Sequence, residues 1–222
     1  MLTRSEQLFE RFCQTRGVIC RRIPEGKTKT PDYELTISSV GILVEVKQLD
    51  ENDEDRRINE AFSRGEETPG GECPSGRVRH QIAEAYAQLK ACYRSGLATG
   101  AVLYNNAGFL NYIDEWTVTT AMFGDYGYHF GIPAPFGGPI VTLGAGFMGG
   151  RKVTRNTCRV LSFVAVLKET ASDGLALEAY HNPFASVRVE PSALSHVATE
   201  QFVHADPHTG KWVHWQPTRL ET

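Results

Sequence analysis

The chain has 222 residues, of which 41% are hydrophobic and 22% are charged, and its formal net charge is −3 at pH 7. This composition is typical of a globular protein with a buried core, and the net charge excludes a uniformly basic nucleic-acid coat but not a local basic groove. No apolar run approaches the roughly 18 residues that would cross a bilayer, so we expect no membrane partner. The five cysteines contain no CxxC pair, which is typical of reduced thiols in a cytoplasmic protein.

The first half of the chain predicts a series of helices and strands. Thr3 and Glu6 have the spacing of a capping box and predict a helix that ends near Gly17. Strand-like runs follow at residues 18–22, 33–37 and 42–48. The last two runs are close enough to form a hairpin. A long helix is then expected over residues 77–94, and a buried strand over residues 101–104.

Two segments look irregular in the sequence. Residues 50–76 are highly charged and contain Gly and Pro, which predicts a mobile excursion with a short helix near residues 58–62. Residues 124–150 are rich in glycine and proline, which predicts loops.

The second half of the chain predicts mainly strands. We expect a helix over 114–122 and strands at 161–167, 175–180, 201–205 and 211–215. Apolar strands resume directly after the glycines, so a domain boundary there is disfavoured. The chain 1–222 is therefore expected to be a single domain, with residues 109–222 as a β-rich extension of a core over residues 1–108.

Charged side chains are concentrated at the second and third predicted strands. Alternation along a strand places Glu45 and Lys47 on one face, and hairpin pairing brings Asp32 and Glu34 towards them. Two neighbouring carboxylates raise each other's pKa unless a cation lies between them, and Mg²⁺ prefers carboxylate, water and phosphate oxygens. The pattern predicts a magnesium site, which Mn²⁺ could also fill. The alternative is an edge hairpin with solvated charges and a cross-strand salt bridge.

The order of the elements adds to this pattern. A helix, three strands, a helix and a strand, with Pro31-Asp32 opening the second strand and Glu45-x-Lys47 in the third, resembles the core of the PD-(D/E)xK nucleases. This restriction-endonuclease-like superfamily includes Holliday-junction resolvases, and the resemblance covers about residues 4–105. It implies a three-layer α/β fold with a central mixed sheet flanked by helices, here extended by the C-terminal strands. It also implies metal-dependent hydrolysis of phosphodiester bonds, with DNA as the expected substrate.

The resemblance assigns roles to individual residues. Asp32 and Glu45 would hold the metal together with the main-chain carbonyl of Val46, and Lys47 would be the catalytic lysine. In the second long helix, Gln88 resembles a glutamine that several branches of the superfamily place near the site. Gln81 is the competing candidate for that position, and a solvated helix position is the alternative for both.

A glutamate of the first helix joins the site in resolvase-like members of the superfamily. The spacing before Gly17 favours Glu6 over Glu10 for this role. The capping box explains Glu6 without any metal, so both interpretations stay open.

Basic residues that could contact phosphates flank the predicted site. We expect nucleic-acid contacts from Arg22, Lys27, Lys29, Arg77 and Arg79. A second basic run follows the glycines, at Arg151, Lys152, Arg155 and Arg159. For each of these side chains, a solvated surface position is the alternative.

Two other functions compete with an active nuclease. A catalytically inactive nuclease-fold module for nucleic-acid binding or protein assembly is consistent with the negative net charge and the acidic segment 50–76. The spacing Gly144-x-Gly146-x-x-Gly149 matches a dinucleotide-binding fingerprint, but the residues after it have no helical stripe. Apolar residues that could form either a homodimer interface or core are Trp116, Phe123, Phe130 and Phe136.

Overall fold

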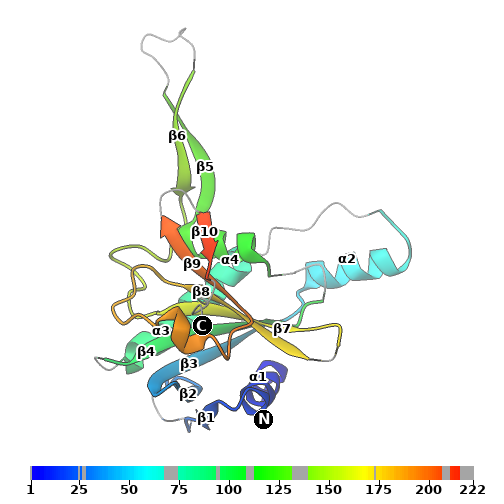
Figure 1. The fold of residues 1–222 in the computed structure, drawn as a ribbon. Coiled ribbons are helices and arrows are strands. Elements are labelled where there is room, and N and C mark those ends of the chain that lie inside the picture. Colours follow the sequence, from blue (N-terminus) through cyan, green and yellow to red (C-terminus); the bar gives the residue numbers. More distant parts are fainter. Residues whose placement is uncertain are drawn as a thin grey trace, which may run out of the picture.

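The computed structural model describes residues 2–24, 26, 29–67, 75–93, 96–108, 113–131, 140–172, 174–206 and 211–215. A mixed sheet of eight strands has helices on both faces, and a two-stranded hairpin projects from it (Figure 1). The predicted mixed α/β architecture, with a large central sheet flanked by helices, is confirmed. Within the described residues, no helix has the length and apolarity needed to cross a membrane.

The first half of the chain folds in the predicted order. Its elements are α1 (Arg4–Thr15), β1 (Ile19–Arg22), β2 (Tyr33–Ile37), β3 (Val40–Leu49), α2 (Asp53–Ser63), α3 (Ser75–Cys92) and β4 (Ala98–Asn105). The capping box of Thr3 and Glu6 is formed at the start of α1. The β2–β3 hairpin turns at Ser38 and Ser39, which both have positive φ, as the favoured two-residue turn requires.

The second half adds strands to the same sheet. Its elements are α4 (Glu115–Phe123), β5 (Asp125–Gly131), β6 (Val141–Met148), β7 (Phe163–Glu169), β8 (Leu175–His181), α5 (Pro191–Leu194), β9 (Glu200–Asp206) and β10 (Lys211–His214). The strand order is β1-β2-β3-β4-β7-β8-β9-β10, with β3, β4 and β7 parallel to one another. The predicted helix at 114–122 and the predicted later strands are confirmed within a residue or two.

The sheet separates two hydrophobic cores. Side chains of α1 and α5 pack on one face of the sheet, and side chains of α3 and α4 pack on the other. Successive residues of β3 divide between them, since Val44 and Val46 belong to the α1 core while Leu43 and Leu49 belong to the α3 core. Glu45 alternates with the two valines and therefore lies on the α3 face.

The interpretation of residues 50–76 needs correction. Helix α2 is longer than the short helix expected near 58–62, and it begins with a second capping box, at Asn52. Ile58 and Ala61 of this helix are buried. The charged composition predicts a mobile excursion with only a short helix, but the carboxylates of Asp53, Glu54 and Asp55 lie in the first turn of α2, where they stabilise the helix through its dipole.

The prediction of loops over residues 124–150 is also wrong where the structure describes them. Strands β5 and β6 pair antiparallel in a sheet of their own. Gly144 and Gly146 lie within β6, and no helix occurs in residues 149–162, all of which the structure describes. The dinucleotide fingerprint is therefore not realised, since it needs a helix N-terminus directly after the glycines to bind the pyrophosphate.

Candidate functional site

A buried ion pair lies in the middle of β3, between β2 and β4. The Lys47 Nζ is 2.9 Å from Oε1 of Glu45, and it donates a hydrogen bond of 2.6 Å to Oε1 of Gln88 on α3. Glu45 is only 1% exposed, which is unusual for a carboxylate. Of the two glutamines considered from the sequence, Gln88 is thus the one that contacts Lys47.

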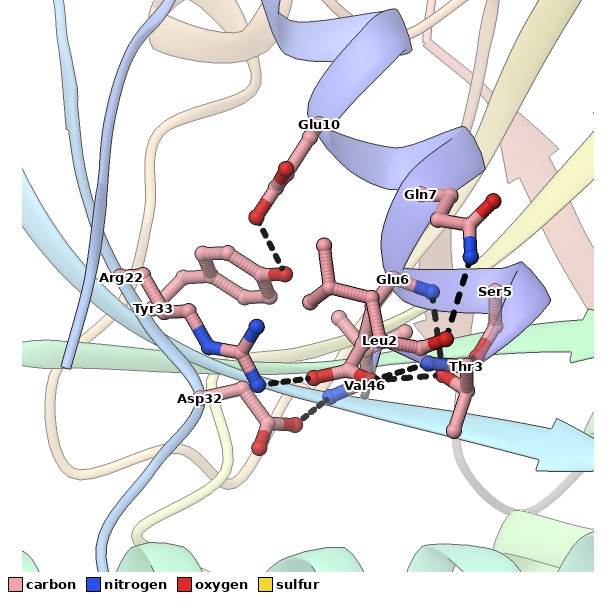
Figure 2. Close-up of polar contacts among 10 residues, drawn as sticks. All are labelled: Leu2, Thr3, Ser5, Glu6, Gln7, Glu10, Arg22, Asp32, Tyr33 and Val46. Atoms are coloured by element: carbon pink, nitrogen blue, oxygen red, sulfur yellow. Dashed lines mark hydrogen bonds and ion pairs between the residues drawn. The ribbon is translucent and has the colours of Figure 1, made fainter. Parts of the chain in front are cut away.

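Asp32 reaches the same strand from the residue before β2. Its Oδ2 accepts a hydrogen bond of 2.8 Å from the main-chain N–H of Val46 (Figure 2). The register of the hairpin explains this contact, because Tyr33 pairs with Val44 and the preceding residue then lies beside Glu45 and Val46. The predicted approach of Asp32 to Glu45 and Lys47 is confirmed.

Glu34 does not join this group. It forms an ion pair with Arg21 on the neighbouring strand β1, and both side chains are partly exposed to solvent. Glu34 lies two residues after Asp32 in the chain. It forms the solvated cross-strand salt bridge that the sequence analysis gave as the alternative for the whole group of charges.

The two carboxylates are incompletely neutralised. Burial, followed by the charge of Asp32, raises the pKa of Glu45 to about 7, although Lys47 and a hydrogen bond from Gln88 lower it. Burial also raises the pKa of Asp32, against the hydrogen bond from Val46. Among the described residues, the buried Oε2 of Glu45 has no hydrogen-bond partner. A proton on one of the two carboxylates, or a divalent cation bound to both, would reduce the repulsion between them.

The donor set fits Mg²⁺. Carboxylate oxygens of Asp32 and Glu45 lie beside the main chain of Val46, and an oxygen-only set is what a hard divalent cation prefers. In the described part of the chain, no group of three or more His, Cys, Asp or Glu side chains could hold a metal ion. Mg²⁺ commonly takes one or two carboxylates and keeps several waters, so two side-chain ligands are sufficient.

The two glutamates of α1 lie at the border of the site. Oε2 of Glu6 completes the capping box, and its Oε1 accepts a hydrogen bond of 3.0 Å from Arg22 (Figure 2). Glu10 instead accepts a hydrogen bond of 2.9 Å from the hydroxyl of Tyr33. Because the charge of Glu6 raises the pKa of Asp32, Glu6 is the α1 glutamate that faces the site electrostatically. Both of its oxygens, however, are bound within the protein.

Two of the predicted phosphate-binding residues form intramolecular contacts. Arg77 pairs with Asp55 at 2.6 Å and fixes α3 to α2. Arg79 pairs with Asp125 at 2.6 Å and donates to the carbonyl of Thr120 at 3.0 Å, so it joins α3 to α4 and the β5–β6 hairpin. These contacts give both arginines a structural role in the free protein.

The other predicted phosphate-binding residues differ in accessibility. Lys29 is exposed, and the Arg22 side chain is 40% exposed while it pairs with Glu6. Lys27 lies outside the described residues. Arg22 lies beside the site, because its charge acts against the burial that raises the pKa of Asp32, whereas the main-chain carbonyl of Lys29 accepts a hydrogen bond from Cys92 near the end of α3. We call Arg22 and Lys29 the cationic rim.

Sequence analysis missed a second, half-buried ion pair on the same face of the sheet. Lys168 of β7 lies 2.5 Å from Oε1 of Glu178 on β8, and the hydroxyl of Tyr180 donates to Oε2 of Glu178 at 3.0 Å. A lysine at the end of an otherwise apolar strand was the signal that could have indicated it.

Comparisons of the chain with protein-family models, with curated proteins and with solved structures find no match in any of the three. Any functional inference therefore rests on the geometry of the site and on the sequence motif.

Proposed function

We propose that the protein is a magnesium-dependent nuclease of the PD-(D/E)xK type that hydrolyses phosphodiester bonds in DNA. Residues 1–108 would form the restriction-endonuclease-like core, and residues 109–222 its β-rich extension in one domain. The observation that carries the proposal is the buried, unpartnered Oε2 of Glu45. It lies in the electrostatic field of Asp32 and on the same side chain as the oxygen that contacts Lys47.

In this proposal, Asp32, Glu45 and the carbonyl of Val46 hold the metal. Bound Mg²⁺, or Mn²⁺ in its place, would supply a Lewis acid that stabilises negative charge on the phosphate. Lys47 would orient the attacking water and offset the charge that develops on the phosphate oxygens. Gln88 positions Lys47 through the hydrogen bond from Nζ, which limits the rotation of a long flexible side chain.

The nucleic acid would approach along the cationic rim. In this proposal the partly exposed Arg22 and the exposed Lys29 would contact phosphates, and Lys27 is assigned there from the sequence alone. Glu6 would hold Arg22 rather than the metal, since both of its oxygens are bound to the protein. A cytoplasmic location belongs to the same proposal, because the four described cysteines are free thiols.

The second candidate is a catalytically inactive nuclease-fold module for nucleic-acid binding or assembly. The Lys47–Glu45 ion pair favours it, because a direct contact of 2.9 Å gives both charges a partner without any metal. The two candidates predict opposite responses to divalent cations.

A cleavage assay with a matched control separates the candidates. Wild type, Lys47→Ala and Lys168→Ala would be incubated with supercoiled plasmid, single-stranded DNA, a four-way junction and RNA, each with Mg²⁺, Mn²⁺ or EDTA. Lys168 is a suitable control because both lysine side chains are 17% exposed and both pair with a glutamate on the same sheet. We expect metal-dependent cleavage that falls by about 100-fold or more in Lys47→Ala only.

Undiminished cleavage by Lys47→Ala would overturn the proposed site. A folded wild-type protein that cleaves nothing and takes up no Mg²⁺ in a calorimetric titration would favour the inactive module. Equal losses in both lysine variants would trace the effect to folding, which circular dichroism would show independently.

A further inference from the structure

A row of aromatic side chains, most of them exposed, runs from α4 along the β5–β6 hairpin. We call Trp116, Tyr126, Tyr128, Phe130 and Phe147 the aromatic row. The hairpin projects from the body of the protein (Figure 1). Tyr128 is 60% exposed and Phe130 is 58% exposed, so large apolar rings face solvent at the outer part of the hairpin. An exposed apolar patch of this kind commonly marks an interaction site.

The strand geometry puts these rings on one face of the hairpin. Tyr126, Tyr128 and Phe130 alternate along β5, and their neighbouring ring centroids are 6.3 Å and 6.2 Å apart. On β6, Phe147 pairs with Tyr126 and continues the row inward. Phe147 is 2% exposed and anchors the row in the core.

The opposite face of the hairpin combines glycines with other side chains. Gly127 pairs with Gly146, and Gly144 follows on the same face, where it pairs with His129. A Cβ at Gly144 would meet no atom within 4 Å, so packing does not require glycine there. The aromatic rings of β5 thus lie on one face of the hairpin, and the other face carries glycines together with Asp125, His129 and Met148.

Cationic side chains lie at the base of the aromatic row. A cleft of about 220 Å³ is lined by Phe147 together with Arg151 and Arg155. Neither arginine has an ion pair within the described part of the chain. Asp125, the acidic residue among the described residues of the hairpin, is paired with Arg79. Arg151 and Arg155 are therefore available to pair with an anion beside Phe147.

We propose that the aromatic row binds the unpaired bases of a single-stranded nucleic acid, with backbone phosphates at Arg151 and Arg155. Successive bases stack on exposed aromatic rings irrespective of sequence, and sheet-borne aromatics bind two or three bases in known modules. The phosphates supply the negative charge that the cationic cleft lacks. A second copy is a less suitable occupant, because a two-fold contact brings identical patches together and like charges repel.

This surface is separate from the Lys47 site. Gln88 and Arg79 lie on opposite flanks of the buried stripe of α3, and they are nine residues apart, which corresponds to about 13 Å along the helix. Binding at the aromatic row therefore needs neither the metal nor the cleavage activity. The inference stands independently of the proposed nuclease function.

The test measures binding in EDTA, where metal-dependent cleavage cannot interfere. Fluorescence anisotropy would follow labelled oligothymidylate, oligouridylate and a duplex of the same length with wild type, Tyr128→Leu and Phe130→Leu. These substitutions keep apolar bulk and remove the stacking ring. We expect each to weaken single-strand binding by about tenfold and to change duplex binding much less.

Two further variants make the test specific. Leu143→Ala is the matched control, since Leu143 is 70% exposed on the same hairpin but carries no ring, and it should leave binding unchanged. Arg151→Gln should reduce the slope of log affinity against log salt by about 0.7. A preference for oligouridylate over oligothymidylate, or the reverse, would identify the source of the bases.

Other results would overturn the inference. Unchanged single-strand binding by both leucine variants would exclude stacking on the row. A wild-type dimer in sedimentation that Tyr128→Leu or Leu143→Ala converts to monomer, without single-strand binding, would identify the row as a self-association surface. Because the substituted side chains are exposed, the variants are expected to fold, and their melting temperatures would verify it.

Discussion

Two lysine–glutamate pairs lie on the α3 face of the same sheet, and they differ in the burial of the glutamate and in how completely it is satisfied. Glu178 has a partner for each oxygen, Lys168 on Oε1 and Tyr180 on Oε2. Glu45 has Lys47 on Oε1, but no partner for its buried Oε2 among the described residues. The two lysine side chains are equally exposed, at 17%, whereas the Glu45 side chain is 2% exposed and the Glu178 side chain is 17% exposed.

The difference indicates which pair is structural. When both oxygens of a carboxylate accept hydrogen bonds, these contacts offset the free-energy cost of removing its charge from water. A buried oxygen without a partner costs free energy unless something else binds it. A second carboxylate beside Glu45 increases that cost. Among the described residues, the β3 pair is therefore the one with an unsatisfied buried carboxylate oxygen, and perturbed carboxylates of this kind cluster at functional sites.

The largest expected effect is on cleavage. Glu45→Gln should lower Mg²⁺-dependent cleavage by about 100-fold or more, because the amide removes the negative charge that would hold the cation. Glu178→Gln should leave cleavage near the wild-type rate. Single-turnover assays with both variants measure the contrast. Equal cleavage rates for the two variants would show that Glu45 and Glu178 do not differ in their importance for cleavage.

The second effect is a dependence of stability on pH. The pKa of Glu45 is about 7 in the folded protein against an ordinary 4.5, so the folded state binds this proton more tightly than the unfolded state. The stabilisation is complete below about pH 4.5 and is lost as the pH rises through about 7, a decline of about 3 kcal/mol in the free energy of unfolding. Asp32, whose pKa is also raised, contributes in the same direction.

Urea unfolding at a series of pH values measures this decline. Because other carboxylates titrate over part of the same range, the useful quantity is the difference between wild type and Glu45→Gln. That difference should grow with pH, and Mg²⁺ should restore wild-type stability on the alkaline side by binding the folded state alone. A difference that does not change with pH would show that Glu45 is charged, and satisfied, throughout.

Much of the fold was predictable because apolar periodicity is a local signal. The helices at residues 4–15 and 75–92, and the hairpin that turns at Ser38, follow from period, capping residues and turn length. The β5–β6 hairpin did not follow, since its glycines and exposed rings leave no alternation of buried and solvated positions. Helix α2 was underestimated for a related reason, because acidic composition obscured its caps.

The candidate site was predictable only to the level of strands. Alternation along β3 put Glu45 and Lys47 on one face, and the hairpin brought Asp32 beside them. The missing partner of Glu45 depends on packing against α3, which no local pattern encodes. The Lys168–Glu178 pair is a diagonal contact between two strands, so it required the register of β7 and β8.

A smaller difference is expected in the free energy of unfolding when the lysine of either pair is replaced. Lys168→Met should destabilise the protein by about 2 kcal/mol, because it removes the cation from a mostly buried carboxylate that keeps one neutral partner. Lys47→Met should cost about 1 kcal/mol in slightly acidic buffer, since Glu45 can take up a proton there. Denaturant unfolding of the two variants under the same conditions gives the order. The reverse order would mean that Glu45 depends on Lys47 more than its raised pKa indicates.

The smallest expected effect concerns Glu6. The same criterion applies to it, namely that a carboxylate is structural when both of its oxygens have hydrogen-bond partners. Both of its oxygens are bonded, to Thr3 and to Arg22, as both oxygens of Glu178 are bonded. Thr3→Ala should therefore cost about 1 kcal/mol of stability through the lost helix cap and leave Mg²⁺ affinity unchanged. Thermal unfolding measures the first quantity and calorimetric titration the second. The main-chain N–H of residue 3 still donates to Oε2 of Glu6 in this variant, and only the bonds of the Thr3 hydroxyl are lost. If the substitution nevertheless strengthened Mg²⁺ binding, loss of the hydroxyl would have freed Glu6 to act as a ligand, and a carboxylate with two bonded oxygens could no longer be taken as structural.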